Sequence, residues 1–234
     1  GSRSERLALH LEGEAAEHTW RITLTPDHSW LRDASRIYPV TVDPITTSSL
    51  KREEIEDAHV DNLNYGTNYQ NSIYLKTMGG DNIQRSFLKF KLPELKTGDM
   101  LVGAHLMMVS LAEDKKSRTV EVHRVKQSWS SATLDWNNRP TCDETIEDRL
   151  NYTGDEIKYV TLDITSLVKN WYIGGGNYGL MVKDAYELSG YTEFLSSDCH
   201  EGFKEMRPHI SLTYMNYSGL EDYWSYHSQD AGRA

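Results

Sequence analysis

Short runs of alternating apolar and polar residues recur through most of this chain, and this period of two constrains its fold more than any other feature. Side chains two positions apart on a strand point to the same face, so alternation predicts strands with one buried face. The runs are rich in β-branched and aromatic residues and are bounded by turn-favouring Gly, Asn, Asp or Pro. They occupy residues 18–24, 72–75, 85–90, 119–125, 159–164, 179–182 and 209–214. Many short strands separated by turns predict an all-β sandwich or barrel.

One segment departs from this pattern and predicts a helix. Residues 165–171 follow a predicted strand and lead into three consecutive glycines, Gly174 to Gly176. Thr165 can cap the first helical turn, and the glycines can end the last one. We therefore expect one short helix near residues 165–173, with residues 53–56 as a weaker helical candidate.

The chain divides into four segments by composition. Residues 1–45 are β-rich and predict a small N-terminal appendage, the end of a preceding domain, while the polar stretch 46–52 is typical of a linker. Residues 53–215 contain most of the predicted strands and form the main module. Residues 216–234 are polar and aromatic without periodicity, which is typical of a connector.

Charge and apolar length exclude several classes of partner. The formal net charge is -10, from 35 acidic and 25 basic residues, which disfavours nucleic acid and anionic membrane surfaces. No run of 18 apolar residues occurs, so we expect no membrane insertion. The acidic balance favours neutral or cationic ligands, or a divalent cation.

The two cysteines, Cys142 and Cys199, are too few for a disulfide framework and have no zinc-type spacing. We expect two unpaired thiols, and a single long-range disulfide is the alternative for an exported chain. Sequence motifs for metalloproteases, serine hydrolases and phosphate-binding loops are absent. We therefore expect a protein that binds and does not catalyse.

Asp57, His59 and Asp61 alternate, so a strand would place all three on one face. The favoured interpretation is the solvated face of an edge strand, because one-sided polar strands are common. The alternative is a Ca²⁺ site with Asp57, Asp61 and Asn64 as ligands, since calcium prefers clustered oxygen atoms.

Aromatic residues provide the candidate ligand-binding surface. Trp129, Trp136 and Trp171 could stack on sugars, but core packing is the favoured interpretation because tryptophan is highly buried on average. Six tyrosines in loops rich in Asn and Gly are better surface candidates: Tyr65, Tyr69, Tyr172, Tyr178, Tyr186 and Tyr191. Tyr, Asn, Ser and Gly together also suit a protein-binding surface, so this composition does not separate a glycan site from a protein site.

Several short motifs occur in an order that resembles one known family, the DNRLRE domain, which is grouped with carbohydrate-binding module family 96. They are residues 57–60, 64–66 and 85–90, Trp129 with Trp136 and Pro140, residues 162–165 with Trp171, and Arg207 with Pro208. Residues 30–44 and 219–233 resemble the segments that flank this domain in YD-repeat (RHS-type) wall-associated proteins of Gram-positive bacteria.

The resemblance implies a jelly-roll-like β-sandwich, a place on the bacterial cell surface and glycan binding. The family's association with acidic polysaccharide does not agree with a net charge of -10. A host-protein-binding adhesin module, for example one that binds immunoglobulin as superantigens do, is the second hypothesis. A structural spacer beside YD repeats is the third. We expect the isolated chain to be monomeric.

Overall fold

A computed structural model of the chain describes residues 7–14, 19–26, 29, 32, 45–49, 51–111, 115–188 and 190–216. The chain forms two compact units: residues 1–44, 95–100 and 215–234 make up the smaller one, and residues 45–94 and 101–214 the larger one. In the smaller unit, β1 (Leu7–Glu14) pairs antiparallel with β2 (Thr19–Pro26). This hairpin is the β-rich appendage expected at the N-terminus. Except for residue 216, the connector expected over 216–234 lies outside the described residues.

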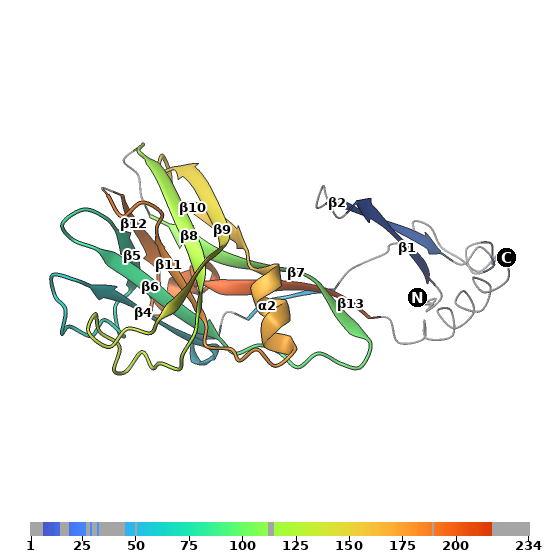
Figure 1. Cartoon of the computed structure of the whole chain (residues 1–234), viewed down its shortest axis with the longest axis horizontal. Coiled ribbons are helices and arrows are strands. Elements are labelled where there is room, and N and C mark those ends of the chain that lie inside the picture. The colour runs from blue at the N-terminus through green and yellow to red at the C-terminus, as the bar shows by residue number, and fades with distance from the viewer. Residues whose placement is uncertain are drawn as a thin grey trace. The chain divides into compact units, whose positions relative to one another are not determined.

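Eleven strands, mostly in the larger unit, form one continuous antiparallel sheet (Figure 1). They are β3 (Ile45–Thr47), β4 (Ile55–Asp61), β5 (Tyr74–Met78), β6 (Gln84–Phe90), β7 (Asp99–Ser110), β8 (Ser117–Val125), β9 (Cys142–Thr153), β10 (Lys158–Asp163), β11 (Leu180–Asp184), β12 (Tyr191–Leu195) and β13 (His209–Asn216). β3 lies partly in the stretch expected to be a linker, and it pairs with β13.

The strand pairings divide this sheet into two layers. The first layer runs β4-β6-β11-β8-β9, and the second contains β3, β13, β7 and β10 together with the pair β12 and β5. The layers join where β5 meets β6, at the residue pair Met78 and Gln84. The all-β, sandwich-like fold expected from the alternation is therefore confirmed.

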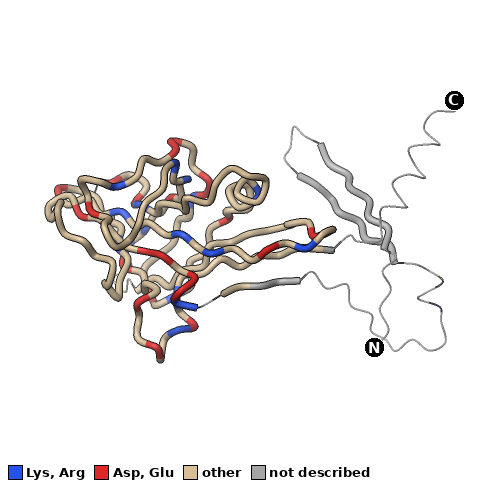
Figure 2. The backbone as a smooth tube through the Cα atoms, turned by 90° about the horizontal axis from the view of Figure 1, so that it is seen from below, with Lys and Arg blue, Asp and Glu red and all other residues tan. Residues whose placement is uncertain are grey.

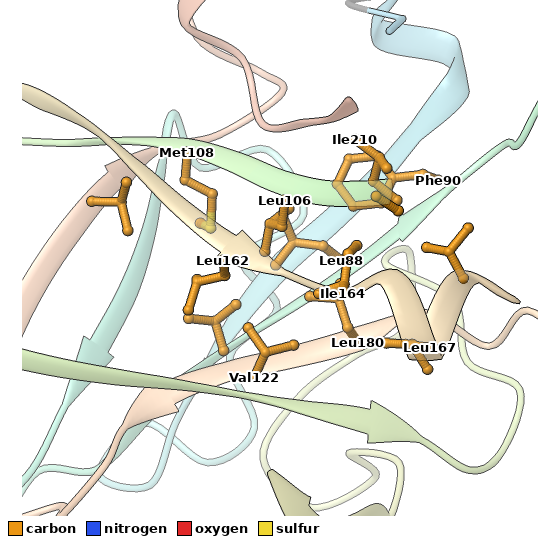
Figure 3. Close-up of a cluster of buried hydrophobic side chains, with 14 of the residues drawn as sticks. Leu88, Phe90, Leu106, Met108, Val122, Leu162, Ile164, Leu167, Leu180 and Ile210 are labelled. Atoms are coloured by element: carbon orange, nitrogen blue, oxygen red, sulfur yellow. The ribbon is translucent and has the colours of Figure 1, made fainter. Parts of the chain in front are cut away.

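Both layers contribute side chains to one large apolar core (Figure 3). The first layer supplies Leu88, Val122 and Leu180, which are fully buried, and the second supplies Leu106, Met108 and Leu162 in the same way. Burying such side chains is the main term that stabilises a fold of this kind. Because successive strand residues point to opposite faces, Arg85, Phe87 and Lys89 of β6 face away from this core.

One α-helix, α2 (Thr165–Tyr172), covers the core with Leu167, Val168 and Trp171, as expected. Gly174 ends it in a left-handed conformation, with a φ of 97°. The expected cap was wrong, however. Thr165 lies inside the helix and its hydroxyl accepts a hydrogen bond from the Ala104 N–H, while the Asp163 carboxylate accepts one from the Thr165 N–H. Asp163 therefore supplies the acceptor at the helix start.

Two 3₁₀ segments, η1 (Arg52–Glu54) and η2 (Glu201–Met206), complete the described elements. The weaker helical candidate over residues 53–56 was wrong. A single 3₁₀ turn ends at Glu54 and strand β4 begins at Ile55, because Ile55 is drawn into the apolar core. No helix in the described part of the chain is long and apolar enough to span a membrane.

Candidate functional site

The structure separates the six candidate tyrosines into exposed and internal ones. Tyr65 and Tyr186 are each 62 % exposed, and Tyr178 and Tyr191 are each 39 % exposed. Tyr69 stacks on His59 with ring centroids 4.2 Å apart. Tyr172 packs against the core and donates a hydrogen bond to the Pro93 carbonyl. Among the described residues no two of the six rings stack on one another, so they do not form one common platform.

Tyr65 lies in a loop that is hydrogen-bonded to a second, longer loop. Its carbonyl accepts from the Trp136 N–H at 3.1 Å and from Asn137 Nδ2 at 3.2 Å. Three residues further on, Asn68 Nδ2 donates to the carbonyls of Ser131 and Leu134, each at 2.7 Å. The loops 62–73 and 126–141 therefore hold each other in place. We call the surface formed by Tyr65, Trp136, Asn137 and Arg139 the Tyr65–Trp136 surface.

The longer loop is held down by apolar packing on the outer face of the first layer. Trp129 and Leu134 join Ala58, Phe87 and Met181 in a second buried cluster. Trp129 meets Phe87 edge to face, and its indole N–H donates to the Tyr178 carbonyl at 2.7 Å. Trp129 is 9 % exposed and Trp171 is 7 % exposed. The interpretation of these two tryptophans as core residues is confirmed, and Trp136 is the one left half-buried at the surface.

Two guanidinium groups contact the Trp136 ring. Arg139 Cζ lies 3.9 Å from the ring centroid and Arg85 Cζ lies 5.4 Å from it. Such cation–π contacts fix a ring in place. Arg85 is itself fixed by two hydrogen bonds to Glu187, at 2.7 and 3.0 Å. Arg139 has no ion pair in the described part of the chain, and burial, followed by repulsion from Arg85, lowers its pKa. Its guanidinium donates a hydrogen bond to the Trp136 carbonyl and lies over the Trp136 ring.

Strand register collects further charged side chains on the same outer face. Arg85 lies opposite Lys183, Lys183 opposite Glu121, and Glu121 opposite Arg149, so one row crosses four strands. Figure 2 shows where basic and acidic residues lie along the backbone. Sequence reasoning missed this row, since a single sequence does not give the register between strands. The cations of this row are ion-paired on the same face, Arg85 and Lys183 with Glu187, and Arg149 with Glu121.

The interpretation of Asp57, His59 and Asp61 as a solvated face was wrong. The three share a face, as expected, but they are only 2, 2 and 3 % exposed. β4 lies at the margin of the first layer, and this face turns toward the interior, where β5 and the segment after β12 cover it. The polar side chains are therefore buried and need partners inside the protein.

For Asp57 and His59, those partners lie in the second layer. Asp57 accepts from Ser197 N at 2.8 Å and from Ser197 Oγ at 2.6 Å, and His59 Nδ1 lies 3.1 Å from the Tyr74 carbonyl. Ser86 Oγ donates to the Lys76 carbonyl at 2.8 Å. We call the three side chains Asp57, His59 and Ser86 the polar seam, because they bond the first layer to the strand edge of the second.

Burial is the main cause of the pKa shifts of Asp57 and His59, the two titratable residues of the polar seam. Desolvation raises the pKa of Asp57 to about 6, although the hydrogen bonds from Ser197 oppose the shift. Desolvation, together with the nearby Lys76, lowers the pKa of His59 to about 4. The seam is thus close to neutral in mildly acidic solution, which suits a buried site.

The three residues expected as calcium ligands do not form one group. Asp57 bonds to Ser197, whereas Asp61 accepts from the backbone of Leu63 and Asn64 and from Asn64 Nδ2 at 2.9 Å. In the described residues, no three side chains of His, Cys, Asp or Glu come close enough to hold a metal ion. Calcium binding by this chain stays a prediction.

Two other features can be placed. Cys142, half-buried, and Cys199, buried, are both free thiols, as expected. A pocket of about 300 Å³ lies between β13, the segment after β6 and residues 48–54. Its floor is apolar, with Phe90, Ile210 and Leu212. It contains none of the six tyrosines, so it is separate from the Tyr65–Trp136 surface.

Comparison with known families identifies the larger unit. A family model, that of carbohydrate-binding module family 96, matches residues 48–207. The chain belongs to this family. The match covers the polar seam, both loops of the Tyr65–Trp136 surface and all strands from β4 to β12, so it contains the sandwich except for β3 and β13.

Three curated relatives of this family 96 chain share the name WapA. The tRNA nuclease WapA of Bacillus subtilis is 26 % identical over 228 residues, which are 91 % of this chain and 9 % of the relative. The tRNA3(Ser)-specific nuclease WapA of Bacillus spizizenii is 27 % identical over 243 residues, 98 % of this chain and 10 % of the relative. The chain thus spans about a tenth of the length of these relatives.

Proposed function

We propose that this chain is a non-catalytic module that binds a glycan on the Tyr65–Trp136 surface. Membership of carbohydrate-binding module family 96 supports the ligand class. The observation that carries the location is the pair of hydrogen bonds from Trp136 N and Asn137 Nδ2 to the Tyr65 carbonyl. These bonds join the loop that carries the exposed Tyr65 to the loop that carries the half-buried Trp136.

The chemistry of this surface suits a sugar. The apolar C–H face of a pyranose packs on an aromatic ring, while its hydroxyl groups need donors and acceptors at the ring edge. Asn137 and Arg139 supply such groups through the side-chain donors and acceptors that remain beside their hydrogen bonds to the Tyr65 and Trp136 carbonyls. The two loops are already bonded to each other, so binding loses less conformational entropy than a mobile site would.

We further propose that the chain has no catalytic activity of its own. The relatives named as nucleases are about ten times longer than the region they share with this chain, and the chain contains no recognised catalytic motif. The same relatives and the family support a place outside the cell. We propose a DNRLRE-type module on the surface of a Gram-positive bacterium, within a YD-repeat (RHS-type) protein.

A glycan array followed by titration with the best-bound oligosaccharide tests the binding proposal. Trp136→Ala and Tyr65→Ala should each weaken binding at least about tenfold, because stacked aromatic rings dominate such sites. Tyr159→Ala is the matched control: Tyr159 is 52 % exposed but belongs to β10 in the second layer, so its loss should leave the affinity unchanged.

Other outcomes point elsewhere. Capture of a host protein that persists after deglycosylation, and that Trp136→Ala abolishes, would favour the adhesin hypothesis. If neither a glycan nor a host protein is bound, the structural-spacer hypothesis would be favoured. Incubation with the bound glycan and with tRNA should leave both intact, and turnover of either one would contradict a purely binding role.

A further inference from the structure

Asp61 is a little-exposed carboxylate without a cation beside it. Its exposed fraction is 3 %, and its oxygens accept from Leu63 N, Asn64 N, Asn64 Nδ2 and Gln84 Nε2, all neutral donors. Within the described residues, no Lys, Arg or His forms an ion pair with it. Burial alone would raise its pKa, but the hydrogen bonds from Asn64 and Gln84 outweigh burial and keep the pKa below the usual value. Asp61 is therefore a negative charge with no positive neighbour.

Three buried oxygen atoms without hydrogen-bond partners lie on the hairpin next to Asp61. They are Thr77 Oγ1, Asn82 Oδ1 and Gln84 Oε1, and they lack a partner throughout the described part of the chain. Thr77 is 1 % exposed and Gln84 is 7 % exposed. Leaving such atoms unpaired costs free energy, so each one in a native protein needs an explanation.

The strand pairing places these residues at the same end of β4, β5 and β6. Gln84 lies opposite Asp61 in the β4–β6 pairing, and the same amide group whose nitrogen bonds to Asp61 carries the unpaired oxygen. Thr77 precedes Met78, the residue that pairs with Gln84, and Asn82 lies in the turn between β5 and β6. Figure 1 shows β4, β5 and β6 next to one another.

We propose that the β5–β6 hairpin and Asp61 bind a divalent oxygen-seeking cation such as Ca²⁺, through the oxygens of Gln84, Thr77 and Asn82. Calcium takes six to eight oxygen ligands from carboxylates, amide carbonyls and water. The three side-chain oxygens supply part of that set, and Asp61 supplies the negative charge that a cation neutralises and a water molecule does not. The sequence predicted Asp57, Asp61 and Asn64 as calcium ligands. The site proposed here includes Asp61 and does not include Asp57.

Thermal melting of the whole chain in CaCl₂ and in excess chelator tests the site, with isothermal titration of CaCl₂ into chelator-treated protein. A ligand that binds the native state alone raises its stability, so the wild-type melting temperature should rise in CaCl₂. Gln84→Met keeps the volume and removes the ligand oxygen, and it should abolish most of this rise. Gln127→Met, at an exposed position, is the matched control and should keep the full rise.

If Gln84→Met unfolds the protein, Thr77→Val tests the proposal in its place. Valine has the shape of threonine without the hydroxyl. If the Thr77 oxygen binds a cation, the variant should show a smaller calcium-induced rise and weaker Ca²⁺ binding in the titration. If the atom has no partner, the variant should be more stable than the wild type in both solutions, which would overturn the proposal. Equal destabilisation with and without calcium would indicate a bound water instead and would also overturn it.

Discussion

The carboxylate of Asp57 accepts hydrogen bonds from both the backbone N–H and the hydroxyl of Ser197, 140 positions further along the chain. Asp57 belongs to β4 in the first layer, and Ser197 follows β12 in the second. The pair lies at the margin of the sandwich, where the second layer has a strand edge with unpaired backbone groups. Side chains of the polar seam take the place of strand pairing there, so the sandwich closes without a further strand.

Removing Asp57 should therefore destabilise the whole larger unit. Asp57→Ala leaves the Ser197 N–H buried without an acceptor, which should cost about 2–4 kcal/mol of unfolding free energy. Urea unfolding monitored by circular dichroism measures the change. Asp155→Ala, on the surface, should leave the urea midpoint almost unchanged. A midpoint for Asp57→Ala equal to that of the control would mean that the seam does not hold the layers together.

The contributions of Asp57 and His59 to the pH dependence of stability should nearly cancel each other. Asp57 has a raised pKa, about 6 against 3.8, so it contributes stability at low pH that is lost as pH rises through 6. His59 has a lowered pKa, about 4 against 6.5, so it contributes stability at neutral pH that is lost as pH falls through 4. Each effect is worth about 3 kcal/mol.

Single variants should uncover the two opposite slopes between pH 4 and 6. Asp57→Asn removes the first effect, so its stability should fall as the solution is acidified. His59→Gln removes the second, so its stability should increase over the same interval relative to pH 7. The wild type should lie between them with a shallow dependence. Parallel curves for all three proteins would contradict these protonation states.

Gly179 is fixed by the close approach of β6. Its φ is 84°, and an added Cβ would lie 2.3 Å from the Leu88 carbonyl oxygen. Gly179→Ala should therefore lower stability by roughly 2–4 kcal/mol. Gly66→Ala is the control, because a Cβ there meets nothing within 4 Å. Both can be measured by thermal melting, and equal melting temperatures would show that β11 can shift away from β6 at little cost.

The alternating runs predicted strands β2, β6, β8, β10, β11 and β13, because the period of two is a local property of strands with one buried face. The helix α2 was predicted for a similar reason, from a short apolar run that ends in glycines. Strands β7 and β9, each 12 residues long, were missed. In β9 most side chains are polar, and it forms a strand because it pairs with β8 along its length.

The sequence alone therefore determined the class of fold, the place of the helix and the presence of exposed loop tyrosines such as Tyr65. It did not determine which residues meet. Asp57, His59 and Asp61 share a face by their spacing, but whether that face meets water or the opposite layer depends on where β4 lies in the sandwich. The row from Arg85 to Arg149 depends on the register of four strands. Such contacts are non-local, since long-range packing and hydrogen bonding choose among arrangements that the local pattern leaves equal.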